Sequence, residues 1–72
     1  EKTNFTSANL TRANFKAASL IDANFTNANL FEADFTGANI LNAIFEGANL
    51  NNATWADGKK CGLNSIGECK AK

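Results

Sequence analysis

The chain has 72 residues, with seven basic and seven acidic side chains, no histidine and two cysteines. A chain of this length makes one small domain, close to the lower limit for a compact core that stabilises itself. It has no apolar run near the ~20 residues of a membrane-spanning helix, so membrane insertion is not expected. No signal peptide is visible and the first residue is Glu1, from which we expect that a targeting segment has been removed.

The charges are unevenly divided along the chain. Residues 1–57 hold three more acids than bases, and residues 58–72 hold three more bases than acids. The basic segment has no interleaved aromatic side chains, so it lacks the pattern of a nucleic-acid-binding surface. We therefore expect no nucleic-acid partner and interpret the lysines near the C-terminus as a solvated end.

An apolar residue recurs at every fifth position through most of the chain. The recurring residues are Phe5, Leu10, Phe15, Leu20, Phe25, Leu30, Phe35, Ile40, Phe45, Leu50 and Trp55, and the residue two positions earlier is Ala in every unit except the first, which has Thr3. Five residues of α-helix rotate a side chain by roughly 500°, so these residues would spiral around a helix. In a strand they would alternate between two faces. A chain that bends once per unit points all of them at one axis, so the period predicts a solenoid of eleven units.

A longer period is superimposed on the period of five. Phe alternates with Leu or Ile at the central positions, which fits coils of two or four units. Ile21 and Leu41 recur in a slot that is mostly polar elsewhere, which favours four units and twenty residues per coil. Repeats that cannot bury an apolar side chain alone must stack on their neighbours. The expected columns are Phe5, Phe25 and Phe45; Leu10, Leu30 and Leu50; Phe15, Phe35 and Trp55; and Leu20 and Ile40.

The eleven units resemble the pentapeptide repeat family, whose consensus is Ala, then Asn or Asp, then Leu or Phe, then two variable residues. The resemblance covers Thr3 to Asp57. It implies an all-β solenoid, a right-handed four-sided parallel β-helix with the central residue and the Ala inside. The Asn or Asp of each unit is expected to bond nearby backbone at the turn. Ile44 and Thr54 depart from that consensus, which leaves their local turn geometry open.

The first residues of the chain, 1–7, enter the first coil without an evident cap. A coil that ends this way leaves unpaired backbone groups at its edge. One expectation is that further repeats or a cap lay upstream and were removed. Another is self-association through the uncapped N-terminal end, and a third is a ragged exposed end.

The repeat breaks after Asp57, and residues 58–72 have a different composition. We expect a β-helix over residues 1–57 and a small C-terminal cap over residues 58–72. The broad side chain of Trp55, in the last central position, is expected to cover the axis. Ser65 is expected to begin a short helical turn, although Gly67 disfavours a helix there.

Both cysteines, Cys61 and Cys69, lie in the cap. A structural disulfide between them would close a short loop, stabilise the cap by about 2–3 kcal/mol and imply an oxidising compartment. A regulatory redox pair is the alternative. Two thiolates without histidine do not make a four-ligand shell, so neither a metal nor another cofactor is expected.

The ending of the chain carries a second resemblance. It is similar to the C-terminal ending of pentapeptide repeat proteins of cyanobacteria and plant chloroplasts, several of them in the thylakoid lumen. The residues that carry this similarity are Trp55, Asp57, Gly58, Cys61, Ser65, Ile66, Gly67 and Cys69. The resemblance implies a thylakoid lumen or a periplasm, reached after removal of a targeting segment.

Several apolar residues fall in slots that should face outward. Ile21, Phe31 and Leu41 directly follow their central residues, and Ile44 lies near them in the sequence. If they gather on adjacent faces they would form a docking patch for a protein partner. The alternative is that they are scattered surface residues, which need no explanation.

Catalysis is not expected. The sequence has no histidine, no glycine-rich phosphate loop and no nucleophile beside a base. We expect a structural or protein-interaction module with an unknown protein partner. The resemblance offers one alternative, a DNA mimic that inhibits a topoisomerase. Such mimicry needs a long rod with a strong negative potential, and this chain is short and neutral.

Overall fold

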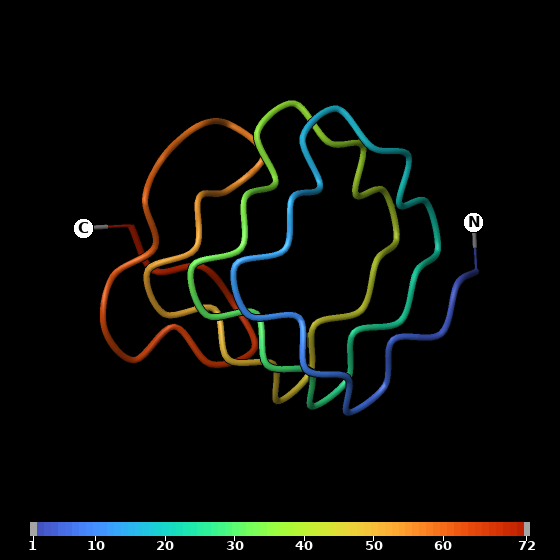
Figure 1. The fold of residues 1–72 in the computed structure, drawn as a ribbon, viewed down its shortest axis with the longest axis horizontal. Helices are drawn as coiled ribbons and strands as arrows, with labels where there is room; N and C mark the ends of the chain where they lie inside the picture. Colours follow the sequence, from blue (N-terminus) through green and yellow to red (C-terminus); the bar gives the residue numbers. More distant parts are fainter. Residues whose placement is uncertain (1, 72) are drawn as a thin grey trace.

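The computed structural model describes residues 2–71, and within them the chain forms a solenoid without a helix. Its β pairing consists of single-residue bridges and not of extended strands. Parallel bridges join residues twenty positions apart: Asn4 to Asn24, Asn9 to Asn29, Asn14 to Asp34, Ser19 to Asn39, Asn24 to Ile44, Asn29 to Asn49, and Asp34 to Thr54. Four bridges per twenty residues give each coil four sides, which confirms the predicted period of twenty. Figure 1 shows the successive coils side by side, with the N-terminus on the right and residues 58–71 on the left.

A tight turn bends the chain once in every five-residue unit. The amide of Ala8 donates to the carbonyl of Phe5 at 3.0 Å, and the same bond recurs along the repeats. Ser7, the third residue of that turn, has a φ of 60°. A positive φ at this place is the requirement of a type II turn. The equivalent residues with positive φ are Arg12, Ala17, Asp22, Asn27, Glu32, Gly37, Asn42, Gly47 and Asn52.

Backbone hydrogen bonds connect each coil to the next on all four sides. On the first side the amide of Phe5 donates to the carbonyl of Asn24 at 2.7 Å, and the amide of Asn24 donates to the carbonyl of Thr3 at 2.9 Å. The amide of Ser7 likewise donates to the carbonyl of Thr26 at 2.8 Å. In each coil that another coil follows, the amides of the central residue and of the residue two positions later therefore point toward the following coil. These bonds satisfy the backbone that burial would otherwise leave unpaired.

The central side chains fill the axis in columns. The rings of Phe5 and Phe25 stack with centroids 4.8 Å apart, and those of Phe25 and Phe45 stack at 5.0 Å. Phe15 and Phe35 stack at 5.2 Å on another side, and neighbouring columns meet edge to face. Aromatic pairs in these arrangements add about 0.5–1.5 kcal/mol beyond burial. Alanines complete the core, and those no more than 1% exposed are Ala23, Ala28, Ala33, Ala48 and Ala53.

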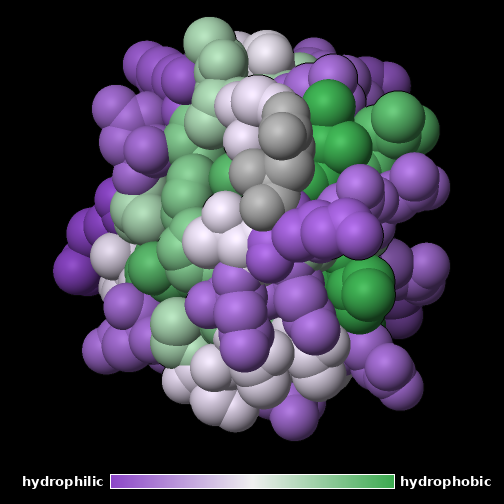
Figure 2. All heavy atoms as spheres, turned by 90° about the vertical axis from the view of Figure 1, so that its right-hand side faces the viewer, coloured by the Kyte–Doolittle hydropathy of each residue, from purple (hydrophilic) through white to green (hydrophobic). Residues whose placement is uncertain are grey.

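Burial is complete where a coil is covered on both sides, either by another coil or by the cap. Phe25, Leu30 and Phe35 of the second coil are fully buried, whereas Phe5 and Phe15 of the first coil are only partly buried. Figure 2 shows apolar atoms reaching the surface between hydrophilic ones on the side of the molecule that carries the N-terminus. Stacking, and not any single unit, therefore provides the burial.

The residue before each central residue organises the turn. The side-chain oxygen of Asn4 accepts a hydrogen bond from the amide of Thr6 at 2.9 Å, an Asx turn. The same bond is made by Asn9, Asn14, Asn24, Asn29, Asp34, Asn39 and Asn49. Ile44 has no side-chain acceptor and Thr54 makes no equivalent bond, yet their turns close, with the amides of Ala48 and Gly58 donating to the carbonyls of Phe45 and Trp55 at 2.9 Å. The turn therefore does not require the Asx bond.

Residues 58–71 fold back antiparallel to the last coil as a cap. Lys60 bridges Thr54, Ile66 bridges Asn49, and Cys61 bridges Ala71. The expected helical turn at Ser65 does not form. Ser65 is instead fully buried, and its hydroxyl donates to the carbonyl of Gly62 at 2.7 Å and accepts from the amide of Lys70 at 3.0 Å. A side chain that serves two backbone groups of the cap is not available to start a helix.

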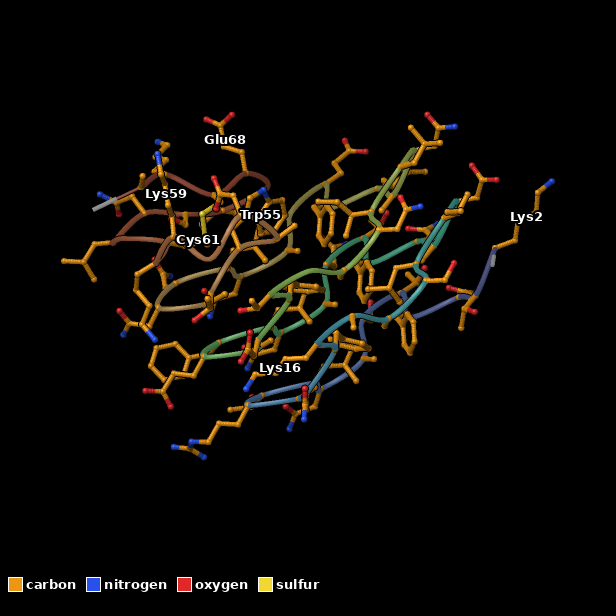
Figure 3. The ribbon with its side chains drawn as sticks, turned by 90° about the horizontal axis from the view of Figure 1, so that it is seen from above. Lys2, Lys16, Trp55, Lys59, Cys61 and Glu68 are labelled. Carbon is orange, nitrogen blue, oxygen red and sulfur yellow. A yellow bond between two sulfur atoms is a disulfide. The ribbon has the colours of Figure 1, made fainter. Side chains whose placement is uncertain are left out.

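A disulfide joins Cys61 and Cys69 within the cap, as expected from the sequence. Cys61 is fully buried and belongs to the hydrophobic core, and Cys69 packs against it. Figure 3 shows Cys61, Trp55, Lys59 and Glu68 at the same end of the molecule and Lys2 at the opposite end. The ring of Trp55 meets Phe35 at 64° and does not stack flat on it. The column of Phe15 and Phe35 therefore ends on a tilted ring.

Candidate interaction surface

The lateral faces of the solenoid are mainly polar, and some of their charged side chains form ion pairs. Arg12 contacts Glu32 of the next coil at 2.9 Å, and Lys16 contacts Asp34 at 3.7 Å. Both pairs are solvent-exposed, so each contributes at most about 1 kcal/mol. Hydrogen bonds from the hydroxyl and the amide of Thr36, together with the charge of Lys16, lower the pKa of Asp34. Glu32 and Asp34 are thus held in ion pairs, and Asp34 also bonds its own turn.

The structure separates the four apolar residues expected to form an outward patch. Ile21 and Leu41 occupy the same slot of successive coils, and Ile44 follows Leu41 across one corner. Phe31 lies ten residues from both Ile21 and Leu41, half a coil away, and so on the opposite side of the solenoid. Leu41 is 61% exposed and Ile44 is 46% exposed, whereas Ile21 and Phe31 are only partly exposed. The strongly apolar surface is therefore Leu41 with Ile44, and Phe31 does not belong to it.

Two further exposed apolar residues lie in the cap, and neither was predicted from the sequence. Leu63 is 78% exposed and Ile66 is 52% exposed. All the exposed large apolar side chains of the described residues thus lie in the last coil or in the cap that covers it. No repeat register extends into residues 58–71, so the spacing of residues does not predict the orientation of these two side chains.

The cap covers only one half of the edge of the last coil. We call residues 48–57 the covered half. Here the amide of Leu50 donates to the carbonyl of Ser65 at 2.7 Å, and the amide of Trp55 donates to the carbonyl of Lys59 at 2.8 Å. The carbonyl of Ala53 accepts from the amide of Cys61 at 2.7 Å. The amide of Asn52 also donates to the carbonyl of Cys61, and the carbonyl of Ala48 accepts from the amide of Gly67. The cap therefore replaces the missing next coil on two of the four sides.

Residues 38–47 form the open half of the same edge, where Gly67 of the cap lies close to Gly47 and Phe45 but makes no backbone hydrogen bond to them. In the first coil the amides of Phe5 and Ser7 donate to the coil that follows. The amides of the equivalent residues in the last coil therefore point toward the cap end. Among the described residues, no group accepts from the amides of Ile40, Asn42, Phe45 and Gly47, and none donates to the carbonyls of Ala38 and Ala43. Ile40 and Phe45 are also only partly buried, although they occupy core positions. An apolar sheet edge with unpaired groups is a site for pairing with another chain.

The described residues enclose no detectable pocket, and they bring no three metal-ligating side chains together. Within the same residues there is no helix of the length and apolarity needed to cross a membrane. The notable surface feature is thus the end of the solenoid, where the open half lies beside the cap.

The comparisons with known proteins agree with this geometry. A family model described as pentapeptide repeats matches the chain in eight copies, over residues 1–37 and 28–54. No curated protein matches the chain in sequence. The matched region contains every parallel bridge of the solenoid. The chain therefore belongs to the pentapeptide repeat family, whose members are generally non-enzymatic structural modules.

Proposed function

We propose that this protein is a non-catalytic protein-interaction module that works in an oxidising compartment, a thylakoid lumen or a periplasm. The observation that carries the interaction role is the bonding of each coil to the next on four sides. This bonding holds outward side chains at one fixed spacing, about 4.8 Å from coil to coil. A surface that is already rigid loses little conformational entropy when a partner binds.

The disulfide supports the compartment. Cys61 and Cys69 are bonded in the cap, and structural disulfides persist where thiols are not kept reduced. The resemblance of the C-terminal ending to lumenal proteins favours the same setting. The right-handed winding implied by the family resemblance is part of this proposal.

Two experiments test the proposal. Thiol labelling of cell extracts prepared under acid quench reports whether Cys61 and Cys69 are oxidised in the cell, and free thiols in most of the protein would refute the oxidising compartment. Affinity capture from the host with the wild-type chain, Leu41→Ser and Phe31→Ser tests the interaction role. A partner captured by the wild type and lost by one variant supports it, and identical capture with all three chains argues against either apolar face as the binding surface.

A DNA-mimicking topoisomerase inhibitor is the competing function. The repeats carry six acids against three bases, a modest excess of three, and two of the six acids are paired with Arg12 and Lys16. Three coils also make a short rod. A gyrase supercoiling assay decides between the two functions, since dose-dependent inhibition by the purified chain would favour the DNA mimic.

A further inference from the structure

Residues 18–27 show what the two sides of the open half bind when a coil follows them. They occupy the same two sides one coil earlier, and their backbone is bonded to residues 38–47 at 2.7–2.9 Å through the amides of Leu20, Asp22, Phe25 and Asn27 and the carbonyls of Ala18 and Ala23. Leu20 and Phe25 are buried under that coil, whereas Ile40 and Phe45 of the same columns are only partly buried. The open half thus lacks a backbone partner and an apolar cover.

The backbone groups of the open half that lack a partner define the shape of what can bind there. Among the described residues, nothing is bonded to the amides of Ile40, Asn42 and Phe45 or to the carbonyls of Ala38 and Ala43. These donors and acceptors alternate along two short extended stretches, joined by the turn in which Asn42 has a φ of 61°. A helix has no free backbone groups at this spacing. The occupant is therefore an extended segment that bends once, added to the edge as a strand is added to a sheet.

The cap limits the size of the occupant. Residues 58–71 occupy the next layer over the covered half, and Gly67 lies close to Gly47. A complete four-sided coil of another folded molecule would meet the cap. A segment that lies over residues 38–46 alone avoids the residues bonded to the cap. This geometry favours a flexible segment of a different protein over a second folded copy of the chain.

The rim of the open half is apolar on its lateral side. Leu41 is 61% exposed and Ile44 is 46% exposed, and they lie beside the partly buried Ile40 and Phe45 in the sequence. An occupant that continues the two columns would place one apolar side chain over Ile40 and another, five positions later, over Phe45. An apolar residue directly after the first would also cover Leu41.

The charge of the rim selects a basic occupant. The open half carries Glu46 and no basic residue, and Glu46 is exposed. A cation placed one coil above an acid has a precedent in this molecule, since Arg12 contacts Glu32, in the equivalent slot of the next coil, at 2.9 Å. Complementary charges of this kind fix the register and the choice of partner. A Lys or Arg directly after the second apolar residue of the occupant would lie over Glu46.

We propose that the open half binds an extended segment of a different protein, which adds half a coil to the solenoid. The segment has two apolar residues five positions apart, a small residue two positions before each, and a Lys or Arg directly after the second. This inference rests on the interaction role proposed above, and it specifies the surface and the kind of partner.

The probe is the synthetic peptide acetyl-Ala-Asn-Leu-Leu-Gly-Ala-Asn-Phe-Lys-amide, whose first Leu, Phe and Lys would lie over Ile40, Phe45 and Glu46. NMR titration of the isotope-labelled full chain, in dilute solution, follows each amide. The peptide is expected to shift the amide signals of Ile40 and Phe45 and to slow their hydrogen exchange by about tenfold or more. The amides of Leu50 and Trp55, already bonded to the cap, are expected to stay unchanged.

A modified peptide tests the backbone pairing. In the parallel register of residues 18–27, the amides of its two asparagines would donate to the carbonyls of Ala38 and Ala43. N-methylation of both amides keeps every side chain and removes these two donors, so binding is expected to be lost. Binding that survives N-methylation, or shifts centred on the covered half, would overturn the proposal.

Two matched pairs of protein variants test the rim. Leu41→Thr is expected to weaken peptide binding by about threefold or more, whereas Phe31→Thr, half a coil away in the same slot, is expected to leave it within about twofold. Glu46→Thr is expected to weaken binding by about two- to fivefold. Thr36→Lys changes the net charge equally on the opposite side and is expected to have no effect. Equal effects within either pair would overturn the assignment of the rim.

The same measurements distinguish the other occupant. Concentrating the chain without the peptide would protect the amides of Ile40 and Phe45 if a second copy covered the open half, and that result without peptide binding would overturn the proposal. A peptide that fails to bind, beside a partner that is still captured from the host, would overturn this surface while leaving the interaction role in place.

Discussion

The repeats and the cap meet the same physical requirement in different ways. In the repeats each coil pairs the backbone groups of the next through hydrogen bonds that recur every five residues, and the core consists of like side chains stacked in columns. The cap has no period, and it depends on particular groups, namely the Cys61–Cys69 disulfide, the buried hydroxyl of Ser65 and a few antiparallel bonds. A periodic structure cannot end by repetition, so a non-repeating segment must supply the last contacts. Here that segment completes only half of them.

The largest expected effect comes from removing a ring inside the repeats. Phe25 is fully buried and stacks between Phe5 and Phe45 at 4.8 and 5.0 Å. Phe25→Ala is expected to lower the free energy of unfolding by about 3–5 kcal/mol. Phe5→Ala, at an end of the same column, is expected to cost about half as much because that ring is partly exposed and has one stacking partner in its column. Urea unfolding followed by the single tryptophan, Trp55, measures both, and equal losses would show that stacking does not govern stability.

The next effect belongs to the cap. Removing the disulfide with the double variant Cys61→Ser and Cys69→Ser is expected to lower the free energy of unfolding by about 2–3 kcal/mol, since the bond closes a loop with a sequence separation of 8. The same shift should appear when the wild-type chain is melted with a reductant. A reductant that shifts the melting temperature of the double variant as well would show that the effect does not come from this bond.

A smaller effect distinguishes two neighbouring alanines in the repeats. Ala17 has a φ of 58°, in the left-handed region, and Ala18 has no positive φ and packs against the core. Ala17→Gly removes the strain of the alanine Cβ and is expected to stabilise the fold by about 0.5–1 kcal/mol. Ala18→Gly is expected to destabilise it by at least about 0.5–1 kcal/mol. Differential scanning calorimetry measures both, and the same sign for both substitutions would contradict the turn geometry.

The smallest effect is a pH dependence at one turn. The pKa of Asp34 is lowered, chiefly by the hydrogen bond from the hydroxyl of Thr36. A carboxylate with a depressed pKa stabilises the fold above its unfolded-state value, and that contribution is lost as the pH falls through its folded-state value. Asp34→Asn should therefore flatten the dependence of the melting temperature on pH below about 4. Melting curves from pH 2 to 7 compare the two proteins, and identical slopes would rule out this contribution.

The repeat body was predictable because one physical constraint applies at every unit. The columns of Phe5, Leu10 and Phe15, the period of twenty and the role of the asparagines follow from where the apolar and polar residues recur. The φ of residues such as Glu32 was not predicted, because that slot holds a different residue type in nearly every unit. The position, and not the side chain, determines the conformation there.

The interaction surface was only partly predictable for the same reason. Leu41 and Ile44 were identified as outward apolar residues, but Phe31 was grouped with them although it lies half a coil away. The exposure of Leu63 and Ile66 depends on how the cap folds back, and the cap has no repeat that would reveal it. The position of the cap over one half of the last coil likewise depends on tertiary packing, which the spacing of residues along the chain does not predict.

Amide hydrogen exchange measured by NMR, in a dilute sample that is monomeric, tests the contrast between the two halves of the last coil most directly. The amides of Leu50 and Trp55 are bonded to the cap, and those of Ile40 and Phe45 have no partner among the described residues. The first two are expected to exchange only with global unfolding, and the second two are expected to exchange orders of magnitude faster. Equal protection of all four amides would contradict the half-covered edge, and with it the account of how this solenoid ends.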